Sequence, residues 1–437
     1  MQAWLSALVP PNRICPFLDL SSIRAKLQQN PDAYRLYAGH FGLDLLSVLP
    51  NRPRLITWLR DPTRRLLSSY HYLRELSAPT SANILTGAYA RAQREAAIKL
   101  SFDQWVRLPQ DKYALHNIQV QFLAGANCSE EQMLPHAIRT LVEADHFGLT
   151  ERMQDSLDLL CHRFVLLPRP LSVKLNASRA GQQTNLPPDT LEIIRQRSDP
   201  AIQLCRVANE IFDQRWHNML VGLELAPPPS APPRRSLPMI LSSFFRKPPP
   251  PSSPSATGGN GSATSSTLRG LIHARLESRF RTLRAKNSPA RYGRFPITDA
   301  IYGDGWMAPV SSPGGRAIRW SGPDPHSVFY LNLIKDVPLQ ISLTMLAVMD
   351  YEIIESFRLQ VNGRRVPLVV EPAPEAEFPY AHRFTGVITP SDLSREPGLV
   401  KLEFFVARTF QEPVASEPEL GPKSLGFAID AIQARPV

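Results

Sequence analysis

A short stretch around residue 60 brings together groups that could bind an anion. An apolar run at residues 55–59 ends at Arg60, and Asp61 and Pro62 follow in positions typical of a helix N-cap and first turn. A strand that leads into a helix places unpaired backbone N–H groups and the positive end of the helix dipole at one edge of a sheet. Arg60 adds a guanidinium fork, and Ser68 adds a hydroxyl about two turns along the helix. The spacing fits equally well an ordinary capped junction with surface arginines.

The elements that must position this stretch belong to a unit of helices and strands over residues 1–225. The run at residues 54–59 is apolar enough for a strand buried on both faces. Predicted helices outnumber strands around it, which favours an α/β unit with a parallel sheet. Thr150 and Asp199 stand where the N-caps of two further helices are expected.

Charge and proline are concentrated between the two ends of the chain. Among the 437 residues there are 43 prolines, and the net charge is +10. Residues 226–289 hold ten basic residues and one acidic residue, so this window carries +9 of that charge and the rest is nearly neutral. A basic tether is therefore expected, and a folded basic face for nucleic acid is not. We expect a Pro/Ser/Gly-rich disordered linker at residues 226–289.

A short helix is expected near residues 268–286 of this linker. Its apolar residues recur at helical spacing with arginines between them. Packing on a neighbouring unit is favoured over a peripheral contact with an anionic membrane or a partner. No apolar run is long enough to span a membrane, and the four cysteines have neither zinc nor disulfide spacing. A cytoplasmic protein of bacterial origin, peripheral to a membrane at most and without a metal, is the expectation.

The C-terminal residues 290–437 have the pattern of an antiparallel β-sandwich. Residues 357–361 and 400–404 alternate between apolar and polar side chains, as half-buried strands do. Asn362 and Gly363 stand between residues 357–361 and a further apolar run at 365–370, which predicts a two-residue hairpin turn. Further short strands with Gly and Pro between them complete the pattern.

The stretch at residues 60–70 reads Arg-Asp-Pro-x-x-Arg-x-x-Ser-x-Tyr. It resembles the 3′-phosphate-binding signature of the carbohydrate sulfotransferases that use 3′-phosphoadenosine-5′-phosphosulfate (PAPS), in particular the heparan sulfate 2-O-sulfotransferase and chondroitin-type branch. Similar segments occur in family order at residues 38–41, 117–125, 147–160 and 175–176. The resemblance implies a P-loop-NTPase-like parallel sheet with flanking helices, and transfer of a sulfuryl group from PAPS to a carbohydrate hydroxyl.

The resemblance also implies roles for individual residues. Arg60 and Ser68 would bind the cofactor, with Asn176 and Arg179 as further cofactor contacts, and Asn117 and Gln119 would face the glycan acceptor. His40 matches a family Gly-His position and would be the catalytic base, although close relatives have a second histidine where this chain has Ala38. A structural hydrogen bond is the alternative role for His40. The other histidines of this region, His71, His116 and His146, are expected to be structural.

The family's other signature, a loop with a lysine that holds the 5′-phosphosulfate, is absent from the sequence, so the sheet is expected to be incomplete at its N-terminus. The first lysine is Lys26. Either the true start lies upstream of Met1 or the loop has been lost, and the missing strand favours an upstream start. The sequence as written is expected to be weakly active or inactive. The alternative function is that of a non-catalytic relic, a scaffold that binds a glycan or a partner.

The sandwich is expected to be an accessory module. It resembles, at residues 303–306, 319–320 and 425–427, a module of bacterial glycan-modifying enzymes, which implies glycan or partner binding. Four aromatic residues offer a sugar platform, but core or rim packing is favoured for them. They are Trp306, Trp320, Tyr330 and Tyr380.

Overall fold

The computed structural model describes most of the chain. The described residues are 9, 11–16, 20–39, 42–49, 53–75, 88–108, 115–125, 128–168, 186–226, 262–286, 289–297, 303–307, 309–411 and 424–437. Residues 227–261 of the predicted linker lie outside this part of the chain, as do His40, Asn176 and Arg179.

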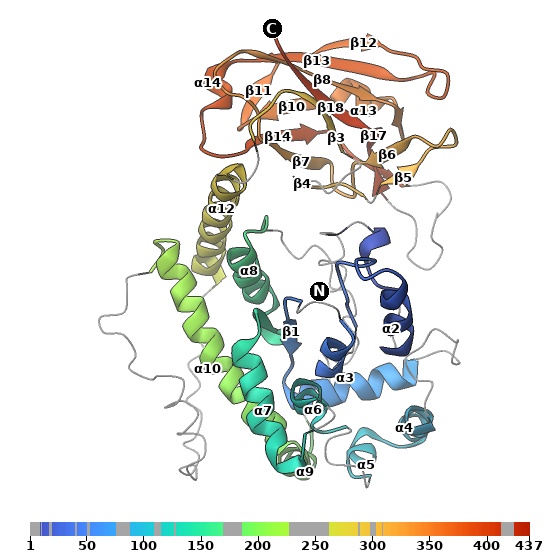
Figure 1. The fold of residues 1–437 in the computed structure, drawn as a ribbon, viewed down its shortest axis with the longest axis vertical. Coiled ribbons are helices and arrows are strands. Elements are labelled where there is room, and N and C mark those ends of the chain that lie inside the picture. Colours follow the sequence, from blue (N-terminus) through green and yellow to red (C-terminus); the bar gives the residue numbers. More distant parts are fainter. Residues whose placement is uncertain are drawn as a thin grey trace.

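The first unit consists of helices around a pair of parallel strands (Figure 1). Strand β1 (Ile56–Leu59) pairs in parallel with β2 (His146–Leu149), and Leu59 lies opposite Leu149 in the register. The longer helices are α2 (Leu20–Gln29), α3 (Pro62–Glu75), α4 (Ala88–Lys99), α7 (Glu130–Glu143), α8 (Met153–Phe164), α9 (Pro188–Arg197) and α10 (Asp199–Gly222). The shorter ones are α5 (Phe102–Val106), α6 (Ile118–Ala124) and the 3-10 turns η1 (Pro11–Arg13), η2 (Leu43–Ser47) and η3 (Thr150–Arg152). Mixed helix and strand content is confirmed, and the parallel sheet has two strands in the described part of the chain.

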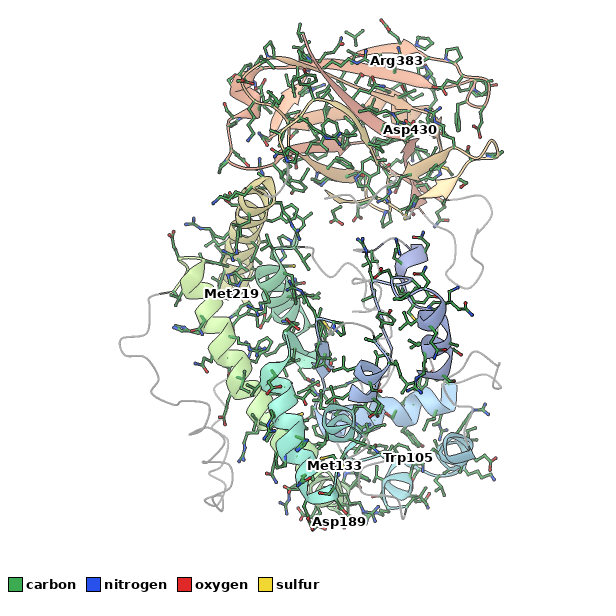
Figure 2. The ribbon with its side chains drawn as sticks, viewed as in Figure 1. Trp105, Met133, Asp189, Met219, Arg383 and Asp430 are labelled. Atoms are coloured by element: carbon green, nitrogen blue, oxygen red, sulfur yellow. The ribbon has the colours of Figure 1, made fainter. Side chains whose placement is uncertain are left out.

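The strands are buried by helices that carry apolar faces. Leu59 and Phe147 pack with Leu204 and Phe212 of α10, all of them nearly inaccessible to solvent. A second cluster lies under α3, where Tyr70 contacts Phe102 and Trp105 edge-on or at a tilt. Trp105 lies at the end of the unit farthest from the sandwich (Figure 2). The first cluster holds the end of β1 and the second holds α3, so together they set where the residues between β1 and α3 lie.

The second unit contains two five-stranded antiparallel sheets that enclose one large core. The first sheet has the order β11 (Arg364–Val366), β10 (Arg358–Val361), β14 (Val400–Phe405), β7 (His326–Leu331), β4 (Gly303–Asp304). The second has the order β12 (Val369–Pro372), β13 (His382–Ile388), β8 (Leu339–Met345), β18 (Ala431–Pro436), β3 (Gly293–Pro296). A four-stranded sheet holds β5 (Val310–Ser311), β6 (Ala317–Trp320), β17 (Phe427–Ile429) and β9 (Ala347–Val348), and β15 (Phe410–Gln411) pairs with β16 (Ser424–Leu425). Two short helices, α13 (Glu352–Ser356) and α14 (Pro390–Leu393), complete the unit. The predicted antiparallel, sandwich-like architecture is confirmed.

The predicted hairpin turn is confirmed, but the strand after it is divided. Asn362 has φ 48° and Gly363 has φ 78°, as a two-residue turn with both residues in the left-handed region requires. The expected single strand at 365–370 forms β11, which pairs with β10, and then β12, which pairs with β13 in the other sheet. The chain changes sheets at Pro367, which lacks the N–H that a continuous ladder would need.

Helix α12 (Ser262–Lys286) contacts both units (Figure 1). Ile272 and Leu276 belong to the core of the first unit, and α12 packs on α8. One to two turns later, Phe280 packs edge-on against Tyr330 of β7, 5.5 Å between ring centroids. Ile272, Leu276 and Phe280 are therefore buried within the protein, which is the packing role that the sequence favoured. Leu268 and Leu271 of the same helix are exposed. No described helix is both long enough and apolar enough to cross a membrane.

Arg281 anchors α12 in the sandwich through both its side chain and its backbone. Its guanidinium donates to the Leu399 carbonyl (2.7 Å) and to Asn362 Oδ1 (2.6 Å), and it also pairs with Glu396. Its backbone carbonyl accepts the N–H of Leu399 (3.1 Å). A side chain on Gly398 would overlap the backbone of Arg281, so this glycine permits the close approach. Arg281 is 3% exposed, and its removal would take one donor from the Leu399 carbonyl and one from Asn362 Oδ1, which would keep the N–H of Lys401.

We expect Arg281→Ala to lower the free energy of unfolding of the sandwich by about 2–3 kcal/mol, because the Leu399 carbonyl and Asn362 Oδ1 each lose a charged donor. The matched control is Arg279→Ala, an exposed arginine on the same helix, which should change stability by less than about 0.5 kcal/mol. Urea unfolding followed by tryptophan fluorescence measures both. Equal effects of the two substitutions would contradict the anchoring role.

Candidate anion-binding site

A pocket of about 270 Å³ lies where the two parallel strands end. Its wall includes Leu59 and Leu149, the last residues of β1 and β2. The carboxyl edge of a parallel sheet is the usual place for a ligand in such folds. Polar residues that follow each strand line the rest, together with residues of α10. The pocket wall therefore includes Arg60, Asp61 and Arg64 from the stretch that the sequence singled out, but not Ser68.

The backbone of Arg60 is held by one amide side chain. The Arg60 N–H donates to Gln119 Oε1 (2.9 Å), and Gln119 Nε2 donates to the Arg60 carbonyl (2.8 Å). The Arg60 side chain lines the pocket, and its Nε is buried with no hydrogen-bond partner among the described residues. A buried donor without an acceptor is costly unless a ligand supplies one. The position and the vacant donor both suit an anion.

Asp61 begins α3 as predicted. Its Oδ1 accepts the N–H of Arg64 (2.9 Å), and its carbonyl accepts the N–H of Arg65 (2.8 Å). The N–H of Asp61 itself donates to Glu151 Oε1 (3.1 Å), so this amide is already bound. An anion in the pocket would therefore bind through side chains more than through the first amide of the helix.

The expected N-cap role of Thr150 is wrong. Its hydroxyl donates to the Leu59 carbonyl (3.0 Å), which ties the end of β2 to the end of β1. The chain makes a 3-10 turn at Thr150–Arg152 before α8 begins at Met153. The N-terminus of α10 likewise has no side-chain cap of its own; Asn117 Oδ1 accepts the N–H of Ala201 there (3.0 Å).

Three arginines and two carboxylates set the charge of the pocket wall. The arginines are Arg60, Arg64 and Arg152, and the carboxylates are Asp61 and Glu151. Arg152 is held by Asp155 and Asp213 and lies over the Phe212 ring, 4.4 Å from its centroid. Within the described residues, neither Arg60 nor Arg64 makes an ion pair. The wall thus offers two guanidinium groups to an anion.

Arg65 and Ser68 lie on the same helix as Arg64. Residues three, four and seven apart share one face of a helix, so Asp61, Arg64, Arg65 and Ser68 line up along α3. Burial lowers the pKa of Arg65 to about 10, which leaves it charged at neutral pH, and its guanidinium donates to the Leu115 and His116 carbonyls. Ser68 is half-buried. Cys205 also lines the pocket, and burial raises the pKa of its thiol to about 12, so it stays protonated.

The two amides predicted to face the acceptor have structural bonds. Asn117 is fully buried; besides accepting from Ala201, its Nδ2 donates to the Arg197 carbonyl (2.8 Å). Gln119 holds the backbone of Arg60, as described above. Both residues stabilise the framework of the pocket, and their contact with an acceptor sugar stays a prediction. The structure joins Arg60 and Gln119 directly, whereas Ser68 is not part of the pocket wall, and its contact with a ligand stays a prediction.

The pocket wall includes four residues that no sequence pattern marked as site residues. They are Arg64, Glu151, Arg152 and Asn209. Glu151 and Arg152 follow β2, whose parallel pairing with β1 brings the two strand ends together. A parallel pairing of residues 146–149 with residues 56–59 would have placed them there. Asn209 comes from the long helix α10, and no local pattern marks it.

The aromatic residues of the sandwich mostly support its core. The Trp306 indole N–H donates to the Val328 carbonyl (3.0 Å), and its ring packs edge-on against Phe329, Phe404 and Phe427. Tyr330 is buried, and Trp320 packs on a smaller cluster. Core packing is confirmed for these three, whereas Tyr380 is 83% exposed.

A scan of known protein families finds none that matches this chain, and a search of curated proteins finds no match. Among the described residues, no group of three or more His, Cys, Asp or Glu side chains could hold a metal ion.

Two histidines near the pocket framework are buried and neutral. Burial, reinforced by Arg197, lowers the pKa of His116 to about 4. Burial, reinforced by Arg215, lowers the pKa of His146 to about 3. His116 Nδ1 lies 3.1 Å from Ser198 Oγ, and His146 lies beside the Trp58 ring, so both have structural surroundings. Neither forms part of the pocket wall.

These histidines make the first unit sensitive to acid. Below pH 6.5, the ordinary pKa of histidine, His116 and His146 are protonated in the unfolded chain but stay neutral in the folded chain. Stability is therefore full above pH 6.5 and is lost as the pH falls toward 4, by on the order of 3 kcal/mol from His116. Urea unfolding at pH 7, 5.5 and 4 measures this loss. His116→Asn should reduce the slope with pH, whereas exposed His136→Asn should not. Identical slopes in all three proteins would refute the assignment.

Proposed function

We propose that the first unit binds PAPS at this pocket and transfers its sulfuryl group to a carbohydrate hydroxyl. The observation that carries the proposal is Arg60, whose backbone is fixed by Gln119 and whose buried Nε has no partner among the described residues. A preorganised guanidinium with an unused donor suits a dianionic phosphate.

The surroundings of Arg60 support binding of a phosphate monoester. Arg64 adds a second guanidinium one turn into α3, and the N-terminal end of that helix favours negative charge. Ser68 lies about one turn beyond Arg64 on α3 and would supply a hydroxyl donor. The carboxylate of Glu151 stands nearby and bonds the Asp61 N–H. Anion binding would then require Arg60 and Arg64, with the helix N-terminus, to outweigh the carboxylates of Asp61 and Glu151.

The roles of the residues follow from their chemistry. PAPS supplies an activated sulfuryl group when it is bound. Arg60, Arg64 and Ser68 would hold its 3′-phosphate, the recognition end of the molecule, and so fix where the reactive end lies. His40, as the proposed base, would take the proton from the acceptor hydroxyl. The glycan acceptor and the role of Asn176 and Arg179 belong to the same proposal.

The first test is binding of the desulfated nucleotide, 3′-phosphoadenosine-5′-phosphate (PAP), by calorimetry. We expect Arg60→Ala to weaken PAP at least about tenfold, because a charge-assisted bond is worth about 1.5–3 kcal/mol. The control is Arg139→Ala, an exposed arginine on α7 outside the pocket wall, which should change affinity less than twofold. Absence of PAP binding by the wild-type chain would overturn the proposed cofactor.

The second test concerns Gln119. We expect Gln119→Leu to weaken PAP binding about three- to tenfold. The Arg60 N–H would lose its acceptor and the Arg60 carbonyl would keep only the weak thiol donor of Cys205, so the guanidinium would no longer be fixed. The matched control is Gln121→Leu on the same helix, because the Gln121 side chain makes no hydrogen bond among the described residues. If the two variants bind PAP alike, Gln119 does not position Arg60.

An assay of sulfate transfer from PAPS to glycan acceptors separates the enzyme from the alternative, a non-catalytic scaffold. Transfer that is lost in Arg60→Ala would support the enzyme. PAP binding without transfer to any acceptor would support the scaffold.

A further inference from the structure

One carboxylate connects the pocket to helix α12. Asp155, on α8, accepts from Arg152 Nε through Oδ2 (3.2 Å) and from Arg269 Nη2 through Oδ1 (2.6 Å). Arg152 lines the anion pocket, and Arg269 belongs to α12. The same aspartate therefore contacts the pocket wall with one oxygen and the linker helix with the other.

Arg269 also neutralises a second, deeper carboxylate. Its Nη1 donates to Asp158 Oδ2 (2.6 Å), and Asp158 is 1% exposed. His273 of α12 and Gln154 of α8 contact the other oxygen of Asp158, each at 3.0 Å. Asp155 and Asp158 are three residues apart on one helix face, so without Arg269 they would repel each other. Arg269 is the cation of α12 that balances both.

Arg152 lines the pocket and also interacts with two carboxylates. It pairs with Asp155 and Asp213, and its guanidinium lies over the Phe212 ring. Each carboxylate that attracts Arg152 lowers the positive potential that an anion in the pocket would meet. Arg269 offsets the charge of Asp155 at 2.6 Å, so docking of α12 restores part of that potential.

We propose that Arg269 and Asp155 couple the docking of α12 to anion binding in the pocket, so that each strengthens the other. The coupling is reciprocal because it is a free energy shared by the two events. It rests on the proposed function only in requiring that the pocket bind an anion. Since Arg281 fixes the other end of α12 in the sandwich, a force or ligand that acts on the sandwich would reach the pocket through this helix.

The sign of two substitutions separates this coupling from a general structural role. Arg269→Ala removes a positive charge and leaves Asp155 free to attract Arg152, so anion binding should weaken about fivefold. Asp155→Asn keeps the shape but removes the negative charge, so anion binding should tighten about threefold. A loss of packing alone would weaken binding in both variants. Arg269→Lys retains the charge without the fork that joins two carboxylates, and should fall between wild type and Arg269→Ala.

The experiment titrates the full-length chain with inorganic pyrophosphate and, separately, with PAP, by calorimetry. The control is Arg275→Ala on the same helix, whose arginine is 54% exposed and pairs only loosely with Glu224 at 3.8 Å. We expect Arg275→Ala to bind within about twofold of wild type, since exposed pairs contribute little. Hydrogen exchange in α12 should slow when pyrophosphate is added to the wild type, and should not slow in Arg269→Ala.

The possible outcomes distinguish a failure of the coupling from a failure of the proposed nucleotide cofactor. Equal affinities of Arg269→Ala and Arg275→Ala, weaker binding in Asp155→Asn, or no binding of pyrophosphate would each overturn the coupling. Pyrophosphate binding with the expected signs, but no binding of PAP, would overturn the nucleotide cofactor and leave the coupling supported.

Discussion

The structure depends on one requirement, that the arginines of α12 find acceptors in two different units. Arg269 reaches carboxylates of α8, and Arg281 reaches a carbonyl and an amide of the sandwich. A helix with Ile272, Leu276 and Phe280 on its buried face gains its stability from both neighbours at once. A nucleic-acid-binding protein would expose its basic charge. In this protein, part of the basic charge of α12 is engaged in intramolecular ion pairs and hydrogen bonds.

The pocket follows from a second constraint, the parallel pairing of β1 with β2. Parallel strands end at the same edge, so the residues after Leu59 and after Leu149 must share a space. The Thr150 hydroxyl donates to the Leu59 carbonyl and the Glu151 carboxylate accepts the N–H of Asp61, and these bonds then fix the geometry of the pocket. What remains open is a small polar volume with more cationic than anionic groups.

Prediction was strongest where a pattern is local. The Asp61 cap, the first helical turn at Pro62 and the Asn362-Gly363 turn depend on residues next to one another, and all three are present. It was weaker where a side chain has several possible partners. Threonine is a residue type that often caps helices. The Thr150 hydroxyl instead donates to the Leu59 carbonyl, because the end of the parallel strand β1 lies within reach.

The sequence by itself determined the two kinds of unit, the basic segment between them and the Asp61-capped helix start that follows Arg60. Each of these is encoded in neighbouring residues, through periodicity, turn chemistry or charge. Only the tertiary structure decided that Gln119 clamps Arg60, that Arg152 joins the pocket, and that Arg269 balances two carboxylates 111 and 114 residues away. Such contacts depend on which surfaces of the packed helices meet, and no spacing along the chain specifies that.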